Sequence, residues 1–328
     1  MNDFWKNTRV LVTGGNGFIG SFVVEKLVKR GALVTVADRM SSGSLRYLEP
    51  LAPKIRLIRG DCADAEFARK AAANQRVVIN LAAHVGGISY NMTHQATMLR
   101  DNFGIASAML EGARLSGVER FLVVSSACVY PRDAAVPTPE TEGHRDEPEP
   151  TNSGYGWAKR MAEKLGMMYA DQFGMKVGIV RPYNAYGPRD NFAVDTSHVI
   201  PGLIRRIMNG EDPLTVWGSG SQTRAFLYVE DLADGIITAI EKYPVPDPVN
   251  LGSDEEVTVG TLATLIAAAA GKEITVKFDT TKPDGSPRRS SDNAKAKEKI
   301  GFTATTGLSA GLSKTISWYV SQTGHLLY

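Results

Sequence analysis

A tyrosine and a lysine stand four residues apart in the segment YGWAK, as Tyr155 and Lys159, and the apolar segment FLVVSS ends earlier in the chain at Ser126. On a helix, residues four apart share one face. A lysine ammonium within a few ångströms favours the phenolate of a tyrosine. The phenol could then move a proton while the serine hydroxyl hydrogen-bonds the substrate oxygen. The three residues together predict acid–base catalysis beside a hydride carrier, although Ser126 by itself would be interpreted as a strand-end cap.

Glycines recur at every third position in the segment TGGNGFIG, as Gly14, Gly17 and Gly20, between a β-branched run and a helical pattern. Such glycines allow a tight turn and let the backbone approach a pyrophosphate at the positive end of a helix. The next apolar run ends at Asp38, whose carboxylate could bind both ribose hydroxyls and would repel a 2′-phosphate. The alternative is a purely structural turn, but this order of elements predicts a dinucleotide site. NAD is favoured, and the neighbouring Arg39 leaves NADP open.

The elements that position these residues alternate along the first part of the chain. Strands are expected at residues 8–13, 32–38, 55–61, 76–83, 121–127 and 177–187, and helices at 18–30, 102–116 and 155–173. Strands that alternate with helices predict βαβ units and a parallel sheet, and near-continuous apolar strands fit a sheet covered on both faces. The segment PVNLGSD, residues 248–254, is expected to return one more strand to this sheet.

After residue 183, glycine and proline interrupt the pattern more often, which indicates shorter elements. We therefore expect an α/β fold, a Rossmann-type doubly wound parallel sheet with a smaller, interleaved C-terminal substrate domain. The expected NAD(P)-binding domain comprises residues 1–182 plus 226–254. The expected nucleotide-sugar-binding domain comprises residues 183–225 plus 255–328.

The composition argues against several other classes of protein. Lysine and arginine total 37 against 35 aspartates and glutamates without a long run of like charge, so no nucleic acid or membrane partner is expected. The two cysteines and five scattered histidines form no disulfide framework and no metal-ligand spacing. We expect no metal and a reducing compartment. No apolar run is long enough to span a bilayer, and the segment MNDFWKNTRV lacks the layout of a signal peptide, so a soluble cytoplasmic protein is expected.

The motifs above, with NLAAHVGG, SSACVYP, RPYNAYGP and WGSGSQTRAFLYVEDLA, resemble the extended short-chain dehydrogenase/reductase family, specifically its nucleotide-sugar epimerases, dehydratases and reductases. The resemblance covers nearly the whole chain. The stretches AAHVGGISYN, YGPRDNF, SHVIPGLIRR and KPDGSPR, and EPTN before YGWAK, are most similar to the GDP-L-fucose synthase and GDP-mannose 3,5-epimerase branches. Simple 4-epimerases rarely combine SSAC with SHVIP.

The resemblance implies roles for five catalytic residues. Ser126, Tyr155 and Lys159 would form the oxidoreductase triad, and Cys128 and His198 would form the acid–base pair that inverts C3 and C5 of a 4-keto sugar. A ketone at C4 acidifies the adjacent C–H bonds, so a base can remove a proton and an acid can return one to the opposite face. A thiolate is a competent base in a positive field, and histidine titrates near neutrality. The alternative is an inert, buried Cys128 and a structural His198.

The resemblance also implies two sets of binding residues. The expected cofactor set comes from the glycine loop, from the ends of neighbouring strands and from the catalytic pair: Gly14, Gly17, Phe18, Ile19, Gly20, Asp38, Arg39, Asp61, Cys62, Leu81, Ala82, Ala83, Tyr155 and Lys159. The expected substrate set joins two cleft residues to three arginines that could pair with a diphosphate: Asn184, Val199, Arg206, Arg224 and Arg288. His84, near the cofactor, is expected to be structural.

A homodimer is a further implication, formed by packing two helices of each subunit into a four-helix bundle. The apolar side chains Met161, Leu165 and Met168 share one face of the expected helix at 155–173. They are compatible with such an interface and equally with an ordinary core.

We therefore expect an NAD-dependent nucleotide-sugar epimerase, with a GDP-hexose as the favoured substrate, that acts through a 4-keto intermediate and inverts C3 and C5. The segment VADRMSSGSLRYL, residues 36–48, is similar to the NAD-holding segment of epimerases and favours a redox-neutral reaction. Two enzyme alternatives stay open: a GDP-L-fucose synthase-type 3,5-epimerase/4-reductase that uses NADPH, and a 4-epimerase of a UDP- or dTDP-sugar. The alternative outside the enzymes is a catalytically inactive NAD-sensing module, and the intact Ser126, Tyr155 and Lys159 count against it.

Overall fold

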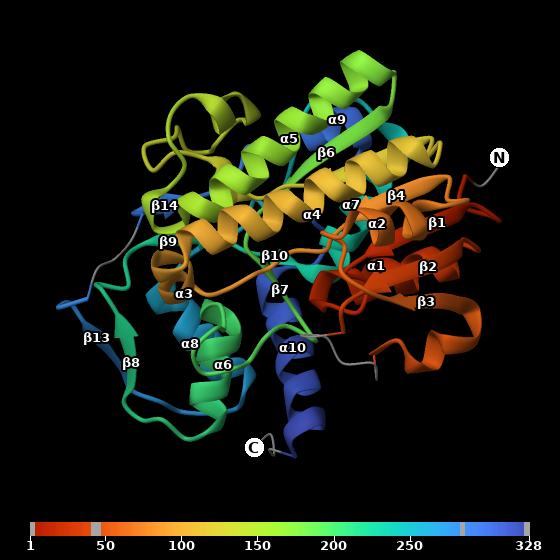
Figure 1. The fold of residues 1–328 in the computed structure, drawn as a ribbon. Helices are drawn as coiled ribbons and strands as arrows, with labels where there is room; N and C mark the ends of the chain where they lie inside the picture. The colour runs from red at the N-terminus through yellow and green to blue at the C-terminus, as the bar shows by residue number, and fades with distance from the viewer. Residues whose placement is uncertain (1–3, 41–46, 283–285, 325–328) are drawn as a thin grey trace.

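Seven parallel strands form the central sheet of the computed structural model, which describes residues 4–40, 47–282 and 286–324 (Figure 1). Their order is β11-β6-β5-β4-β1-β2-β3. The strands are β1 (Arg9–Thr13), β2 (Leu33–Asp38), β3 (Ile55–Arg59), β4 (Val77–Asn80), β5 (Arg120–Val124), β6 (Lys176–Pro182) and β11 (Val249–Leu251). The order reverses between β1 and β4, and ligands of such sheets bind outside the carboxyl ends of the strands at this point. The predicted doubly wound sheet is confirmed, including the strand within residues 248–254.

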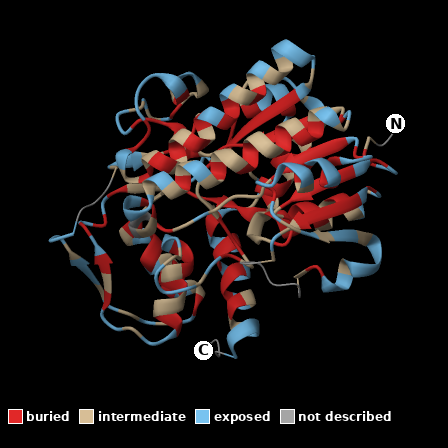
Figure 2. Ribbon diagram, in the orientation of Figure 1, coloured by how far each residue is buried: buried red, intermediate tan, exposed pale blue. Residues whose placement is uncertain are grey.

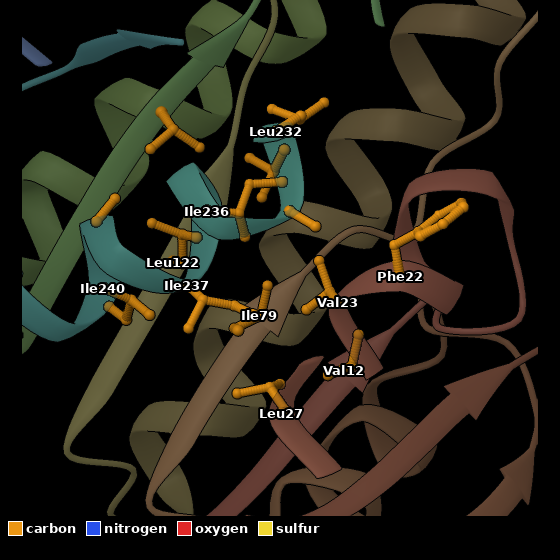
Figure 3. Packing of buried hydrophobic residues seen from close by; sticks show 14 of the residues in the cluster. Val12, Phe22, Val23, Leu27, Ile79, Leu122, Leu232, Ile236, Ile237 and Ile240 are labelled. Carbon is orange, nitrogen blue, oxygen red and sulfur yellow. The ribbon is translucent and has the colours of Figure 1, made fainter. Parts of the chain in front are cut away.

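Helices cover both faces of this sheet because successive side chains of each strand point to opposite faces. Val10 and Val12 pack with α1 (Phe18–Lys29) and α7 (Val229–Lys242), whereas Leu11 packs with the layer of α2 (Ala65–Ala72), α4 (Gln95–Leu115) and α5 (Ser153–Phe173). Figure 3 shows the first layer, where Ile237 of α7 lies beside Ile79 of β4, and Leu27 of α1 lies beside Val12 of β1. The inner strands of the sheet are buried, whereas the edge strand β3 and the outer faces of the helices are partly or fully exposed (Figure 2).

The helix α4 begins at Gln95, several residues earlier than the sequence predicts. The residue before it, His94, provides no side-chain cap, so no local signal marks the start. Contacts from elsewhere in the chain fix this turn. The side-chain oxygen of Gln95 accepts a hydrogen bond from the backbone N–H of Gly154, and its amide donates to the carbonyl of Pro150.

A second core lies among α6 (Val199–Met208), α8 (Val259–Ala269) and α10 (Leu308–Thr323), with buried side chains that include Ile204, Leu262 and Leu312. Short strands flank it: β7 (Ala185–Tyr186) pairs with β10 (Leu227–Tyr228), β8 (Leu214–Trp217) with β13 (Val276–Asp279), and β9 (Thr223–Ala225) with β12 (Glu256–Thr258) and β14 (Arg288–Arg289). The predicted domain boundaries stay a proposal. The helix α9 (Ala294–Ile300) contributes Ala296 and Ile300 to the core of the main sheet although its residues were assigned to the second domain.

The remaining described elements are short: α3 (Ile88–Thr93) and the 3-10 helices η2 (Glu49–Lys54), η3 (Ala127–Val129), η4 (Glu140–His144) and η5 (Pro150–Asn152). Residues 41–46 of the segment predicted to hold NAD, and residues 283–285 of KPDGSPR, lie outside the described residues. Within the described ranges no helix is long and apolar enough to cross a membrane. The same ranges contain no group of three or more His, Cys, Asp or Glu side chains that could hold a metal ion.

Candidate active site

The glycine loop lies between β1 and α1 and is packed too tightly for side chains at two of its glycines. Gly14 has a φ of 63°, and a Cβ there would lie 2.8 Å from the backbone nitrogen of Ala82. A Cβ on Gly20 would lie 2.2 Å from the carbonyl oxygen of Gly14. A Cβ on Gly17 would meet only that same oxygen, at 3.2 Å. The loop is therefore closed toward the sheet and open at Gly17, immediately before the first helical residue, Phe18.

The carboxylate of Asp38 is fixed at the end of β2 by backbone donors. One oxygen accepts the N–H of Asn16 at 3.2 Å, and the other accepts the N–H of Met40 at 2.6 Å. The exposed Arg39 reaches the exposed Asp61 at 3.5 Å. The acid predicted to bind ribose thus stands beside the glycine loop, and the arginine that left NADP open faces a second acid.

The segment after β4 completes this side of the site. The hydroxyl of Thr13 donates to Asn80 at 2.6 Å and accepts from the backbone N–H of Ala82 at 3.0 Å, which ties the predicted residues 81–83 to the glycine loop. Burial, with the charges of Asp38 and Asp61, raises the pKa of the Cys62 thiol to about 12. This predicted cofactor contact is therefore a neutral, apolar one.

These residues fit a dinucleotide cofactor. The glycine cradle leaves its backbone accessible at Gly17, and both polar atoms of the fully buried Asn16 amide lack a hydrogen-bond partner within the described ranges. The positive end of α1, which begins with Phe18 and Ile19, favours an anion at the same place. When bound, such a cofactor supplies a nicotinamide ring that accepts or donates a hydride.

The segment after β5 presents Ser126 and Cys128 on one side. Both residues are half-buried, while Ala127 between them is buried. The hydroxyl oxygen of Ser126 accepts the backbone N–H of Cys128 at 3.1 Å. The first turn of α5 approaches so closely that a Cβ on Gly156 would lie 2.5 Å from the carbonyl oxygen of Cys128. This close contact brings the neighbouring Tyr155 near Cys128, whose charge acts on the phenol.

Tyr155 and Lys159 lie one turn apart at the start of α5, as the sequence predicts. The ammonium of Lys159 lies 5.4 Å from the centre of the Tyr155 ring and donates to the carbonyl of Val124 at 2.8 Å. Burial lowers the pKa of Lys159 to about 8, against the charges of Cys128 and Glu163. Burial, with the charge of Cys128, raises the pKa of Tyr155. Tyr155 therefore keeps its proton in this environment and is suited to donate it to a developing alkoxide.

His198 directly precedes α6 without a side-chain cap hydrogen bond, in a loop that reaches back to the main sheet. A Cβ on Gly87, in the segment after β4, would lie 3.5 Å from the carbonyl oxygen of Asp195. The surrounding protein lowers the pKa of His198 by disfavouring the charged imidazolium, although the residue as a whole is exposed. His198 makes no hydrogen bond with Cys128 within the described part of the chain. His84 pairs with Asp101 at 3.2 Å, which agrees with a structural role.

The predicted substrate residues occupy different surroundings. Asn184, with a φ of 27°, donates to the carbonyl of Ala225 at 2.8 Å, and the exposed Val199 begins α6. The guanidinium of Arg206 is held by Glu211 and by the carbonyl of Thr215.

Two other arginines lie side by side on the paired strands β9 and β14, as Arg224 and Arg289. Arg289 donates to the carbonyl of Ala127 at 2.7 Å, between Ser126 and Cys128. Burial, with the charge of Arg289, lowers the pKa of Arg224. Arg288, which the sequence pointed to, is exposed and paired with Glu256 at 2.6 Å. Adjacent residues of a strand face opposite sides, and this is the signal that could have directed attention to Arg289.

Residues 10–252 match the model of the NAD dependent epimerase/dehydratase family. The chain belongs to this family. GDP-L-fucose synthase 1 of Arabidopsis thaliana is 35% identical over 319 residues, which cover 96% of this chain and 94% of that protein. GDP-L-fucose synthase of Escherichia coli (strain K12) is 34% identical over 328 residues, which cover 95% and 96%. UDP-glucose 4-epimerase of Thermotoga maritima has a solved structure with UDP-glucose that matches with a TM-score of 0.85 at 29% identity, covering 96% of this chain and 99% of that one.

The family assignment confirms the resemblance stated from the motifs and makes the protein an NAD(P)-dependent enzyme of the epimerase/dehydratase type. The relatives named GDP-L-fucose synthase favour the epimerase/reductase alternative over the redox-neutral epimerase that the sequence placed first. Glu163 and Arg181, which lie fully buried behind Lys159, are features that sequence reasoning did not single out.

Proposed function

We propose that this family member acts on nucleotide sugars as a 3,5-epimerase and 4-reductase of a GDP-linked 4-keto hexose. The observation that carries the proposal is the meeting of Ser126, Cys128 and Tyr155, where the end of β5 meets the start of α5. An acid–base thiol and a proton-donating phenol are thereby available to one sugar ring. The similarity to proteins named GDP-L-fucose synthase supports the same assignment.

The proposed epimerisation uses Cys128 and His198 as base and acid at C3 and C5. The C4 ketone stabilises the enolate that forms when one residue removes the C–H proton, and the other residue returns a proton to the opposite face. The lowered pKa of His198 makes its imidazolium a stronger acid, which suits the return of a proton to the enolate. Arg289, which lies at the carbonyl of Ala127, and Arg224 would pair with the diphosphate.

The proposed reduction follows at C4. Ser126 would hydrogen-bond the ketone oxygen and Tyr155 would donate its proton to that oxygen, while a bound reduced nicotinamide would supply the hydride for the carbon. The products are an alcohol, the oxidised cofactor and a tyrosinate that solvent reprotonates. The ammonium of Lys159 stabilises this tyrosinate because the two groups share one helix face.

We propose NAD(H) rather than NADP(H) as the cofactor. The carboxylate of Asp38 is fixed by two backbone donors beside the glycine loop and would repel a 2′-phosphate. Asp38→Gly should therefore weaken NADH binding and improve the relative binding of NADPH, measured by nicotinamide fluorescence. Unchanged preference would contradict this assignment.

A second candidate is a redox-neutral epimerase that retains NAD and returns the same hydride to C4. Asp38 favours this candidate, because NAD-holding epimerases are the proteins that the segment 36–48 resembles.

We also propose a homodimer through α4 and α5. The outer surface of α5 exposes Met161 and Met168.

The experiment supplies a 4-keto-6-deoxy GDP-hexose with NADH or NADPH in D₂O. Deuterium at C3 or C5 together with stoichiometric loss of absorbance at 340 nm supports the epimerase/reductase. Deuterium without cofactor consumption favours the redox-neutral candidate. Cys128→Ala should abolish the label but leave hydride transfer to C4, whereas Cys62→Ala, which changes only a predicted cofactor contact, should keep the label. Product formed without label would exclude the enolate and the proposed role of Cys128.

A further inference from the structure

A buried ion pair lies behind the active site. The side chain of Glu163 on α5 is 0% exposed, and that of Arg181 on β6 is 1% exposed. The guanidinium makes two parallel hydrogen bonds to the carboxylate, from Nε at 2.9 Å and from Nη2 at 2.7 Å. Removing two charges from water is costly, and apolar residues of similar volume often give equal or greater stability. The pair is therefore poorly explained by stability alone.

Both partners hold the segment that carries the catalytic serine and cysteine. The hydroxyl of Ser125 donates to Glu163, and its backbone N–H donates to the carbonyl of Val180 at 2.8 Å. At the other end of the segment, the Nη1 of Arg181 donates to the hydroxyl of Tyr130 at 3.0 Å. Ser126 and Cys128 thus lie between two anchors that belong to one ion pair.

Glu163 also lies one helical turn after Lys159, and its charge favours the ammonium form of that lysine. Burial alone would raise the pKa of Glu163, but the charge and hydrogen bonds of Arg181, with those of His144 and Ser125, hold it at about 2. The carboxylate therefore stays ionised at neutral pH.

Few other charges face these two groups. Cys128 favours the ammonium of Lys159 more strongly than Glu163 does, and Tyr155 lies beside that lysine on α5. Around the ion pair, the imidazole of His144 on η4 lies 3.1 Å from the carboxylate. Arg160 lies on α5, one turn before Glu163. Arg181 also donates to the backbone carbonyl of Glu140 on η4. Glu163 is the one carboxylate among the groups that act on Lys159.

We propose that Glu163 is a positioning residue of the active site, which holds residues 124–130 in place through Ser125 and keeps Lys159 protonated. The inference deepens the proposed function and rests on the roles given there to Tyr155 and Lys159. Glu163 touches no reacting atom and acts only through these neighbours. Arg181 makes its buried charge tolerable.

The central variant is Glu163→Gln combined with Arg181→Met. The single change Glu163→Gln leaves the arginine buried without its partner, and the protein could unfold for that reason alone. The double change removes both charges, so the thermal midpoint should return toward that of the wild type. The negative charge beside Lys159 is still missing, and the lysine should lose its proton at a lower pH. The basic limb of the kcat profile should therefore move down by about one pH unit, with KM within twofold.

Two further measurements separate positioning from folding. Ser125→Ala keeps the ion pair but removes the hydroxyl that Glu163 holds, so kcat should fall about tenfold, the value of one charge-assisted hydrogen bond. Hydrogen exchange of the amides of residues 124–130 should accelerate in both variants, without a change in α4 or in the C-terminal half of α5. Glu119→Gln is the control, since it breaks ion pairs with Arg76 and Lys176 at the opposite ends of the strands.

The inference is overturned if the double variant shows the wild-type pH profile and wild-type exchange at residues 124–130, because the pair would then be structural only. If the double variant does not fold, Ser125→Ala is the test. A Ser125→Ala protein with the kcat and hydrogen exchange of the wild type would also overturn the inference. If the wild type turns over no GDP-sugar, the proposed function fails. The exchange measurement still decides whether Glu163 holds the segment.

Discussion

A methyl group added at Gly20 provides the sharpest test of the glycine loop. The Cβ of Gly20→Ala would lie 2.2 Å from the carbonyl oxygen of Gly14 and 2.8 Å from the Cα of Gly15. Both neighbours are backbone atoms, and ordinary contact distances are about 3.5 Å, so α1 must move away from the loop. Extra methylenes in packed interiors cost about 1–3 kcal/mol, and the rigid neighbours place this one at the upper end. A loss of about 3 kcal/mol lowers the thermal midpoint by roughly 6–12 °C at 2–4 °C per kcal/mol.

The matched control is Gly17→Ala in the same loop. Its Cβ would meet only the carbonyl of Gly14, at 3.2 Å, and the φ of Gly17 is −81°, which any residue adopts. We expect a shift in the thermal midpoint of no more than about 2 °C. The added methyl would, however, stand on the open side of the loop, where a pyrophosphate must approach the backbone. NADH binding, followed by nicotinamide fluorescence, should therefore weaken at least tenfold in this variant.

The two variants together separate folding from binding. Gly20→Ala should lose both stability and NADH binding, and Gly17→Ala should lose binding alone. A Gly20→Ala protein with the wild-type thermal midpoint would refute the packing argument. A Gly17→Ala protein that binds NADH with wild-type affinity would show that the cofactor does not approach the loop at its open side.

Three other predictions concern substrate binding, the pH dependence of stability and the oligomeric state. Arg289→Ala should raise the KM for the nucleotide sugar at least tenfold, whereas Arg288→Ala, which breaks an exposed ion pair, should change it less than twofold. Burial raises the pKa of Asp190 to about 7, so its contribution to stability is present at low pH and lost as the pH rises through 7. Asp190→Asn should therefore raise the free energy of unfolding at pH 8, by at most about 4 kcal/mol, and with it the thermal midpoint. In calorimetry this gain should vanish as the pH falls toward 4. Met168→Glu places a charge on the exposed face of α5 and should convert the proposed homodimer to a monomer in light scattering.

Much of the fold could be predicted from the sequence, because apolar residues recur with the period of a strand or of a helix wherever one face of the element is buried. The strand expected at residues 32–38 is β2 (Leu33–Asp38), and the helix expected at 155–173 is α5. The start of α4 at Gln95 was beyond such reasoning, since contacts with Gly154 and Pro150 fix it rather than a local cap. Patterns of hydrophobicity report burial, and only indirectly which distant segments touch.

The same limit applies to the candidate site. The glycine loop, Asp38 and the spacing of Tyr155 and Lys159 are local signals. In the structure the loop follows β1, Asp38 ends β2, and Tyr155 and Lys159 lie at the start of α5, as the pattern predicts. The pairing of Arg289 with Arg224, and of Glu163 with Arg181, depends on strand register and on the packing of α5 against β6. Strand periodicity could have directed attention to Arg289, but neither periodicity nor composition shows which residue on a distant element becomes the partner.

The place of β11 in the sheet has a consequence for synthesis on the ribosome. The strand β6 ends at Pro182, but its outer neighbour β11 begins only at Val249. While the nascent chain extends through the intervening residues, the N–H and C=O groups along that edge of β6 have no strand beside them. Unpaired apolar edges of this kind recruit other chains. Translational pauses in this interval, or truncation after β6, are therefore expected to favour aggregation and to make the newborn chain dependent on chaperones.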